Sequence, residues 1–140
     1  MRWAGLLLLA GCALQSWTVP QPYFSTKQQR DLFARAVTAT EKHCGGVRDT
    51  NEESGIIISP WIAWNTGEGL VLTQCMVTLL NGDEHVRDVR VTFAARRCPL
   101  SDMADLAALA PTCELADTVP EQVKNGLERT SAQLERDIAR

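Results

Sequence analysis

The sequence of 140 residues lacks any hydrophobic run long enough to cross a bilayer. Its apolar stretch Trp3–Ala10 has eight residues, whereas a membrane-spanning helix needs roughly 20. No second apolar segment, no internal repeat and no low-complexity tract follows it. These absences exclude a transmembrane helix and a repeat architecture, and they favour one small folded domain.

Catalytic and metal-binding motifs are also missing. The chain has no Gly-x-Ser-x-Gly elbow, no phosphate loop and no His-Glu-x-x-His helix. Of its two histidines, His43 suits a helix end and His85 follows a polar turn. The run Asp49–Pro60 partly resembles a calcium loop, but its glycine is one place late and its twelfth position is Pro60 instead of Glu. We therefore expect a non-enzymatic protein with no metal and no cofactor.

What is present begins at the amino terminus, where Arg2 precedes the apolar run and Leu9-Ala10-Gly11-Cys12 ends it. This segment resembles the signal peptide and lipobox of bacterial lipoproteins. The resemblance implies that Cys12 is joined to diacylglycerol, that the chain is cut before Cys12, and that the new amino terminus is acylated, with palmitate among the chains. Ala13 in place of Asp implies sorting to the outer membrane. The alternative is an ordinary secretory signal in which Cys12 is incidental.

The resemblance divides the chain into three parts. Residues 1–11 are the expected signal peptide, residues 12–24 a lipidated tether with Pro20 and Pro22, and residues 25–140 one domain. Removing 11 of 140 residues leaves 129, with 13 basic against 17 acidic side chains and a net charge of −4. This charge argues against a nucleic-acid partner and against electrostatic attachment to anionic lipids. We therefore expect the protein to attach to the membrane through the acyl chains on Cys12 alone.

Hydrophobic periodicity predicts an α+β fold. A capping box at Ser25–Gln28 and apolar residues at helical spacing predict a first helix that ends at Gly45-Gly46. Three strands follow, at 56–64 with a break at Pro60, at 70–80 and at 86–95. An odd loop of three residues at 81–83 would place Cys75 opposite Val89.

Two carboxy-terminal helices complete the prediction. Ser101 is expected to cap a helix over 102–110, and Thr118 with Glu121 to open the last helix. The expected architecture is thus an amino-terminal helix, a three-stranded antiparallel meander and two helices, packed as two layers with two disulfides.

Four cysteines remain after Cys12 is assigned to lipidation, and an even number in an exported chain indicates two disulfides. Hairpin geometry separates Cys75 from Cys98 by roughly 30 Å, which excludes that pair. We favour Cys44–Cys75 with Cys98–Cys113. The pairing of Cys44 with Cys98 and of Cys75 with Cys113 stays open.

Two features are candidates for partner binding. Trp61 and Trp64 are an odd number of residues apart on one strand, so they should face opposite sides and leave one of them partly exposed. The alternative is that a helix, or the bulge at Pro60, buries both rings. The last helix carries a narrow apolar stripe that either packs on its own domain or docks a partner helix. The stripe consists of Val123, Leu127, Leu134 and Ile138.

These observations predict a lipid-anchored envelope lipoprotein, with its domain in the periplasm or at the surface. It would act as a small accessory subunit that binds another protein in secretion, motility or outer-membrane assembly. The alternative is a module that binds a small ligand or the cell wall, with the strand of Trp61 and Trp64 lining a cleft.

Overall fold

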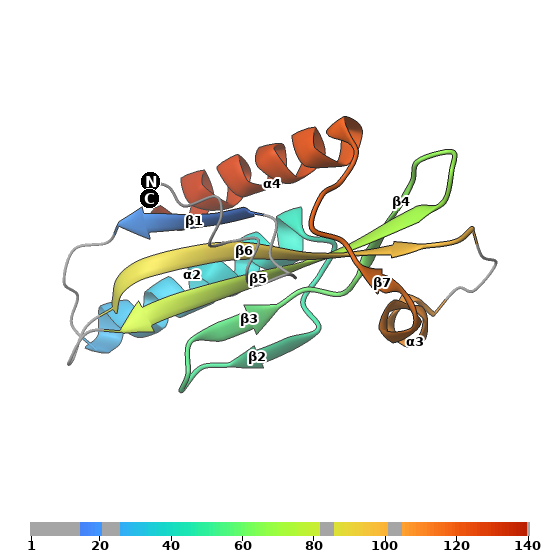
Figure 1. Ribbon diagram of the computed structural model, residues 1–140. Helices are drawn as coiled ribbons and strands as arrows, with labels where there is room; N and C mark the ends of the chain where they lie inside the picture. Colours follow the sequence, from blue (N-terminus) through green and yellow to red (C-terminus); the bar gives the residue numbers. More distant parts are fainter. Residues whose placement is uncertain (1–14, 21–25, 82–85, 101–104, 140) are drawn as a thin grey trace.

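The computed structural model describes residues 15–20, 26–81, 86–100 and 105–139, with side chains over 30–80, 89–100 and 105–138. These residues form a mixed fold in which helices cover an antiparallel sheet (Figure 1), as predicted. The helices are α2 (Thr26–His43), α3 (Leu106–Leu109), the 3-10 turn η1 (Ala110–Thr112) and α4 (Glu121–Ala139). None of the described helices is both long enough and apolar enough to cross a membrane.

The sheet is larger than the predicted three-stranded meander. It contains seven strands within the described residues: β1 (Gln15–Pro20), β2 (Asp49–Asn51), β3 (Ile56–Ile58), β4 (Ile62–Asn65), β5 (Leu70–Asn81), β6 (Val86–Cys98) and β7 (Glu114–Leu115). Its main path is β1-β6-β5-β3-β2, while β4 also pairs with β5 and β7 with β6. The additional strands are not indicated by local periodicity, because β2 and β7 are too short to show a period and β1 pairs with a strand far away in the sequence.

Residues 15–20 lie in the sheet, although we expected them in the tether. β1 pairs antiparallel with β6 from Gln15 opposite Phe93 to Pro20 opposite Asp88. Pro20 ends the strand, in keeping with the confinement of proline to strand ends and edges. The sheet therefore begins three residues after Cys12, and Cys12 itself lies outside the described residues.

The predicted break at Pro60 is confirmed, and it divides one expected strand into β3 and β4. Both pieces pair with β5, Ile58 opposite Met76 and Ile62 opposite Thr73. Ser59 joins them, because its hydroxyl accepts the amide of Cys75 at 2.9 Å and its own amide donates to the Cys75 carbonyl. The ladder thus continues through the interruption.

The long β5–β6 hairpin has a different register from the predicted one. Cys75 lies opposite Phe93, not Val89, and the register shifts between Leu80 and Asn81. The expected three-residue loop is therefore wrong in length, and residues 82–85 lie outside the described part. Because the displacement is four residues, an even number, the buried face is the predicted one.

Helices α2 and α4 cover one face of this sheet (Figure 1). Leu32 and Ala36 of α2 are fully buried against the odd-numbered residues of β5 and β6, among them Val77 and Val91. The α4 stripe joins the same core, with exposures of 0% to 3%. The main core therefore lies between this face of the sheet and the two long helices. The expected packing of all helices on one face is wrong for α3, which contacts the other face.

A second, smaller core lies on the other face at one end of the sheet. Leu72 and Cys98 are buried there beneath Leu109 and Ala110. Asp105 caps α3 by accepting the amides of Ala107 and Ala108. We predicted one helix over 102–110, whereas the α-helix in the described residues covers only Leu106–Leu109 and continues as the 3-10 turn η1. Its expected cap, Ser101, lies outside the described residues.

The structure contains one of the two predicted disulfides. Cys98 and Cys113 are bonded, with their Cα atoms 5.0 Å apart. Cys44 and Cys75 are free thiols, so the prediction of a second bond is wrong. Both thiols are buried and interact through a hydrogen bond, so the geometric reasoning brought the right residues together but not the covalent bond.

Candidate binding cleft

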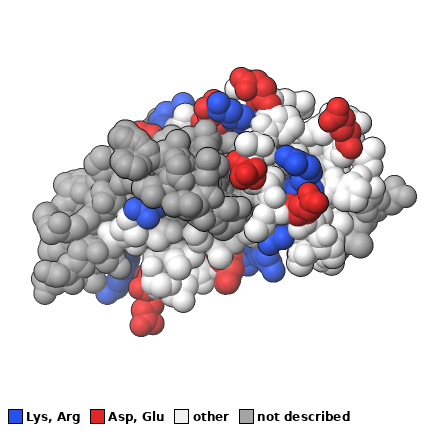
Figure 2. Space-filling view, viewed as in Figure 1, with Lys and Arg blue, Asp and Glu red and all other residues white. Residues whose placement is uncertain are grey.

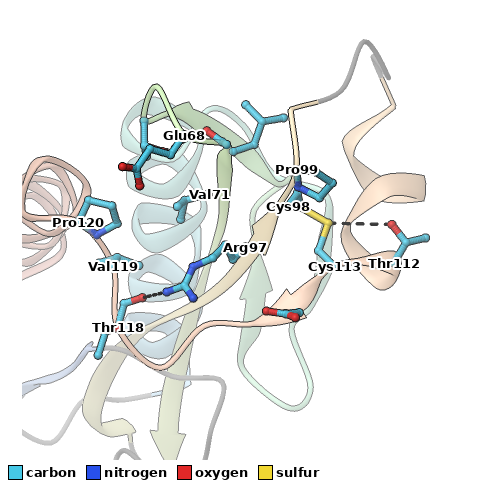
Figure 3. A pocket seen from close by; sticks show the side chains of 14 residues that line it. Glu68, Val71, Arg97, Cys98, Pro99, Thr112, Cys113, Thr118, Val119 and Pro120 are labelled. Atoms are coloured by element: carbon cyan, nitrogen blue, oxygen red, sulfur yellow. Dashed lines mark hydrogen bonds between the residues drawn. A yellow bond between two sulfur atoms is a disulfide. The ribbon is translucent and has the colours of Figure 1, made fainter.

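A cleft of about 820 Å³ opens where β5 begins and β6 ends, at the open end of the β5–β6 hairpin. Four segments form its walls: the β4–β5 turn, the end of β6, the loop that leaves η1, and the residues before α4 (Figure 3). Ligand sites in proteins are commonly 300–1,000 Å³, so its size suits a small molecule or an extended peptide segment. Residues that line the walls include Thr66, Glu68, Arg97, Cys98, Glu114 and Val119.

Glycine at position 69 allows the turn to approach the end of β6 closely. A Cβ atom on Gly69 would lie 2.7 Å from the carbonyl oxygen of Cys98. The turn itself is closed by Thr66, whose amide and hydroxyl both donate to the Gly69 carbonyl at 3.1 Å. The wall that carries Glu68 is therefore held in place by backbone geometry.

The disulfide braces the opposite wall. Cys98 ends β6, Cys113 follows η1, and their bond ties the loop to the sheet. Arg96 adds a second tie, because its guanidinium donates to the Cys113 carbonyl at 3.1 Å. A preformed cleft limits the entropy lost when a ligand binds.

Charged groups of both signs meet at the cleft. The guanidinium of Arg97 points toward Thr118 and donates to its carbonyl at 3.4 Å (Figure 3). Glu114 is the cross-strand partner of Arg97, and Glu68 projects from the turn. The cleft can therefore receive hydrogen-bond donors and acceptors, a pattern that suits the main chain of a peptide.

A second arrangement joins the carboxy-terminal ends of the two long helices. Nε2 of His43 lies 2.6 Å from Oδ2 of Asp137, with side-chain exposures of 9% and 22%. The hydrogen bond from His43 lowers the pKa of Asp137, and the positive charges of His43, Lys42 and Arg136 lower it further, although desolvation opposes them. The sequence placed His43 at a helix end but carried no sign of a partner 94 residues away.

Both candidate tryptophans are half-buried and lie on opposite faces. Trp64 packs on the main core beside α4 and donates from Nε1 to the Thr73 hydroxyl at 2.9 Å. Trp61 packs on the smaller core. The large cleft is lined by neither ring. The structure thus uses both rings in packing.

The four stripe residues of α4 are all buried in the main core. Of the two uses that the sequence left open, the structure shows packing on the domain itself. The cleft was missed because its walls come from four segments brought together only by folding.

Reagents in solution cannot reach the thiols of Cys44 and Cys75 in the folded protein, because both are buried. Exposure is 1% for Cys44 and 2% for Cys75. The hydrogen bond with Cys44 raises the pKa of the Cys75 thiol well above its ordinary value, and burial and the charge of Cys44 raise it further. Such a thiol stays protonated and unreactive.

No protein-family model matches this chain, and a search of curated proteins found no match. Among the described residues, no three His, Cys, Asp or Glu side chains are grouped so as to hold a metal ion.

Proposed function

We propose that this protein is a lipid-anchored envelope lipoprotein that binds another envelope protein and catalyses no reaction. The observation that carries the binding role is the preformed cleft at the end of the β5–β6 hairpin. The lipobox-like residues Leu9–Cys12 support the anchor. The outer membrane is the expected location, with the domain in the periplasm or at the surface.

The form of the cleft favours an extended segment of a partner chain. It is open, runs between separate strands and turns, and offers Arg97, Glu68 and backbone groups on opposing walls. An extended peptide supplies alternating amide donors and carbonyl acceptors. Figure 2 shows cationic and anionic side chains interspersed on the visible face, a distribution that supports directional contacts more than bulk electrostatic attraction.

The anchor is tested by mass spectrometry of the protein purified from membranes. We expect the amino-terminal peptide to begin at Cys12 and to carry diacylglycerol and an acyl chain. An unmodified Cys12 would contradict the proposed anchor.

The cleft is tested by photocrosslinking in intact cells. A photoreactive residue in place of Glu68 should give one defined protein adduct, and the same residue in place of Glu52, exposed in the β2–β3 turn, should not. Arg97→Glu should abolish the adduct at position 68 and lower the melting temperature only slightly, because Arg97 is exposed although the new carboxylate would face Glu114. Equal labelling at both positions, or labelling indifferent to Arg97→Glu, would argue against the cleft.

A small ligand is the second candidate function, because the same cleft falls within the size range of small-molecule sites. It would be favoured if the crosslinker at position 68 captured no protein while a small molecule that co-purifies with the wild-type domain was absent from Arg97→Glu.

A further inference from the structure

The outer edge of β6 is divided between two strands. β5 pairs with one side of β6 along its length, so β1 and β7 both lie on the other side. β1 occupies the positions from Asp88 to Phe93, and β7 occupies Arg96 and Arg97. The amide of Ala116 donates to the carbonyl of Ala95 at 3.1 Å. Only Ala94 therefore separates the positions of β6 that face β1 from those that face β7 and Ala116.

Very little chain separates Gln15, the first residue of β1, from the proposed lipid. Only Ala13 and Leu14 lie between Cys12 and Gln15, so the Cα atoms of Cys12 and Gln15 are within about 11 Å of each other. Leu115 of β7 lies opposite Arg96, three positions beyond Phe93 and thus about 10 Å along β6. Its apolar side chain is 54% exposed.

We propose that the acyl chains on Cys12 hold the edge formed by β1 and β7 against the bilayer. The proposal rests on the lipidation of Cys12 proposed above. The short connection between Cys12 and Gln15 sets this orientation. Electrostatic attraction does not contribute, because the net charge after cleavage is −4 and gives no attraction to anionic lipids. Leu115 is the apolar side chain placed to meet the membrane surface.

The opposite edge of the sheet then faces away from the membrane. β1 and β2 lie on opposite edges (Figure 1), four strand spacings or about 19 Å apart. The turn between β2 and β3 carries the exposed acids Glu52 and Glu53. Glu114, which lines the cleft, belongs to β7, so a partner segment would enter the cleft close to the bilayer surface.

The orientation is measured with the full lipidated protein in phosphatidylcholine vesicles that contain a spin-labelled lipid quencher. Leu115→Cys and the matched control Glu52→Cys each receive one thiol-reactive fluorophore. The buried Cys44 and Cys75 do not compete in the folded protein. We expect about twofold or more stronger quenching at position 115, because that label lies nearer the bilayer by about the width of the sheet.

A second variant distinguishes the effect of the short connection from any affinity of the protein surface for the bilayer. Twenty Gly/Ser residues inserted after Leu14 add a reach of roughly 25 Å and should reduce quenching at position 115 to the level at position 52. Equal quenching at both positions with the native spacing, or quenching at position 115 that survives the insertion, overturns the proposal. Flotation with the vesicles is read in the same samples. A chain that fails to float refutes the anchor and the orientation together, whereas a floating chain with equal quenching refutes the orientation alone.

Discussion

At the scale of single residues, Gly126 of α4 lies directly against the ring of Trp64. A Cβ atom at position 126 would overlap Cη2 of Trp64 and lie 2.8 Å from Cζ3. Trp64 cannot easily yield, because its Nε1 is bonded to the Thr73 hydroxyl. The helix thus carries glycine where sequence alone would favour alanine.

Gly126→Ala should therefore destabilise the protein by about 1–3 kcal/mol, because overpacking outweighs the gain of about 1 kcal/mol in helix propensity. Urea denaturation measures the difference. In a Trp64→Leu background the same substitution should become neutral or stabilising. A stabilising effect in the wild-type background would contradict the contact.

The His43–Asp137 pair predicts a specific dependence on pH. The pKa of Asp137 is lowered in the folded state, so its ionised form stabilises the fold at pH values above the ordinary carboxyl value of 3.8. This contribution is lost as pH falls through the lowered pKa. Asp137→Asn should consequently reduce stability at pH 6, and the difference from wild type should shrink in acid.

Denaturant midpoints of both proteins across this pH range provide the measurement. Asp117→Asn is the matched control, because Asp117 is an exposed acid outside the helices. A pH-independent difference for Asp137→Asn would mean that the carboxylate acts by packing alone.

At the scale of elements, the long periodic segments were predictable and the short ones were not. α2, α4, β5 and β6 each repeat a hydrophobic period often enough to be recognised in isolation. β2 and β7 have three and two residues, too few to show a period. β1 was hidden for a different reason: its pairing is with a strand more than 60 positions away in the sequence.

The cysteines show the same limit. Geometry excluded Cys75–Cys98, and the observed register still separates them, because Cys98 lies opposite Leu70, five residues from Cys75. That reasoning needed only the hairpin. Whether neighbouring thiols are bonded depends on local side-chain geometry, which a sequence does not carry.

Removal of the Cys98–Cys113 bond should lower stability by about 3 kcal/mol, as expected for a loop of 15 residues. The double variant Cys98→Ser/Cys113→Ser tests this by urea denaturation. Reduction of the wild-type protein before unfolding should give the same loss. Hydrogen exchange should quicken in α3 and η1 and remain slow in α2, because α2 packs on the other core.

At the scale of the whole molecule, two cores on opposite faces share the same pair of long strands. The main core lies beneath α2 and α4, and the smaller one beneath α3 and η1. The cleft forms where β5 and β6 extend beyond the main core toward the smaller one, so its walls belong to elements from both faces. Sequence patterning predicted the main core, but the cleft follows from how the two cores are joined.

Truncation of the amino terminus should show that residues before Gln15 serve the anchor and that β1 stabilises the fold. A chain of residues 15–140 keeps β1 and should unfold with the same midpoint as the full protein, since it retains the whole described ladder between β1 and β6. A chain of residues 21–140 loses the ladder from Gln15 to Pro20 and uncovers the edge of β6. Each lost hydrogen bond contributes about 0.5–1.5 kcal/mol, so the shorter chain should be less stable by a few kcal/mol.

Thermal and urea denaturation of the two truncated chains supply the comparison, and the oligomeric state of the shorter one adds to it, because an uncovered strand edge is prone to pairing between molecules. Equal midpoints for the two chains would show that β1 adds nothing to the fold. In that event residues 13–24 would be free to act as the tether that the sequence alone suggested, and the domain would not be held at the bilayer by its edge.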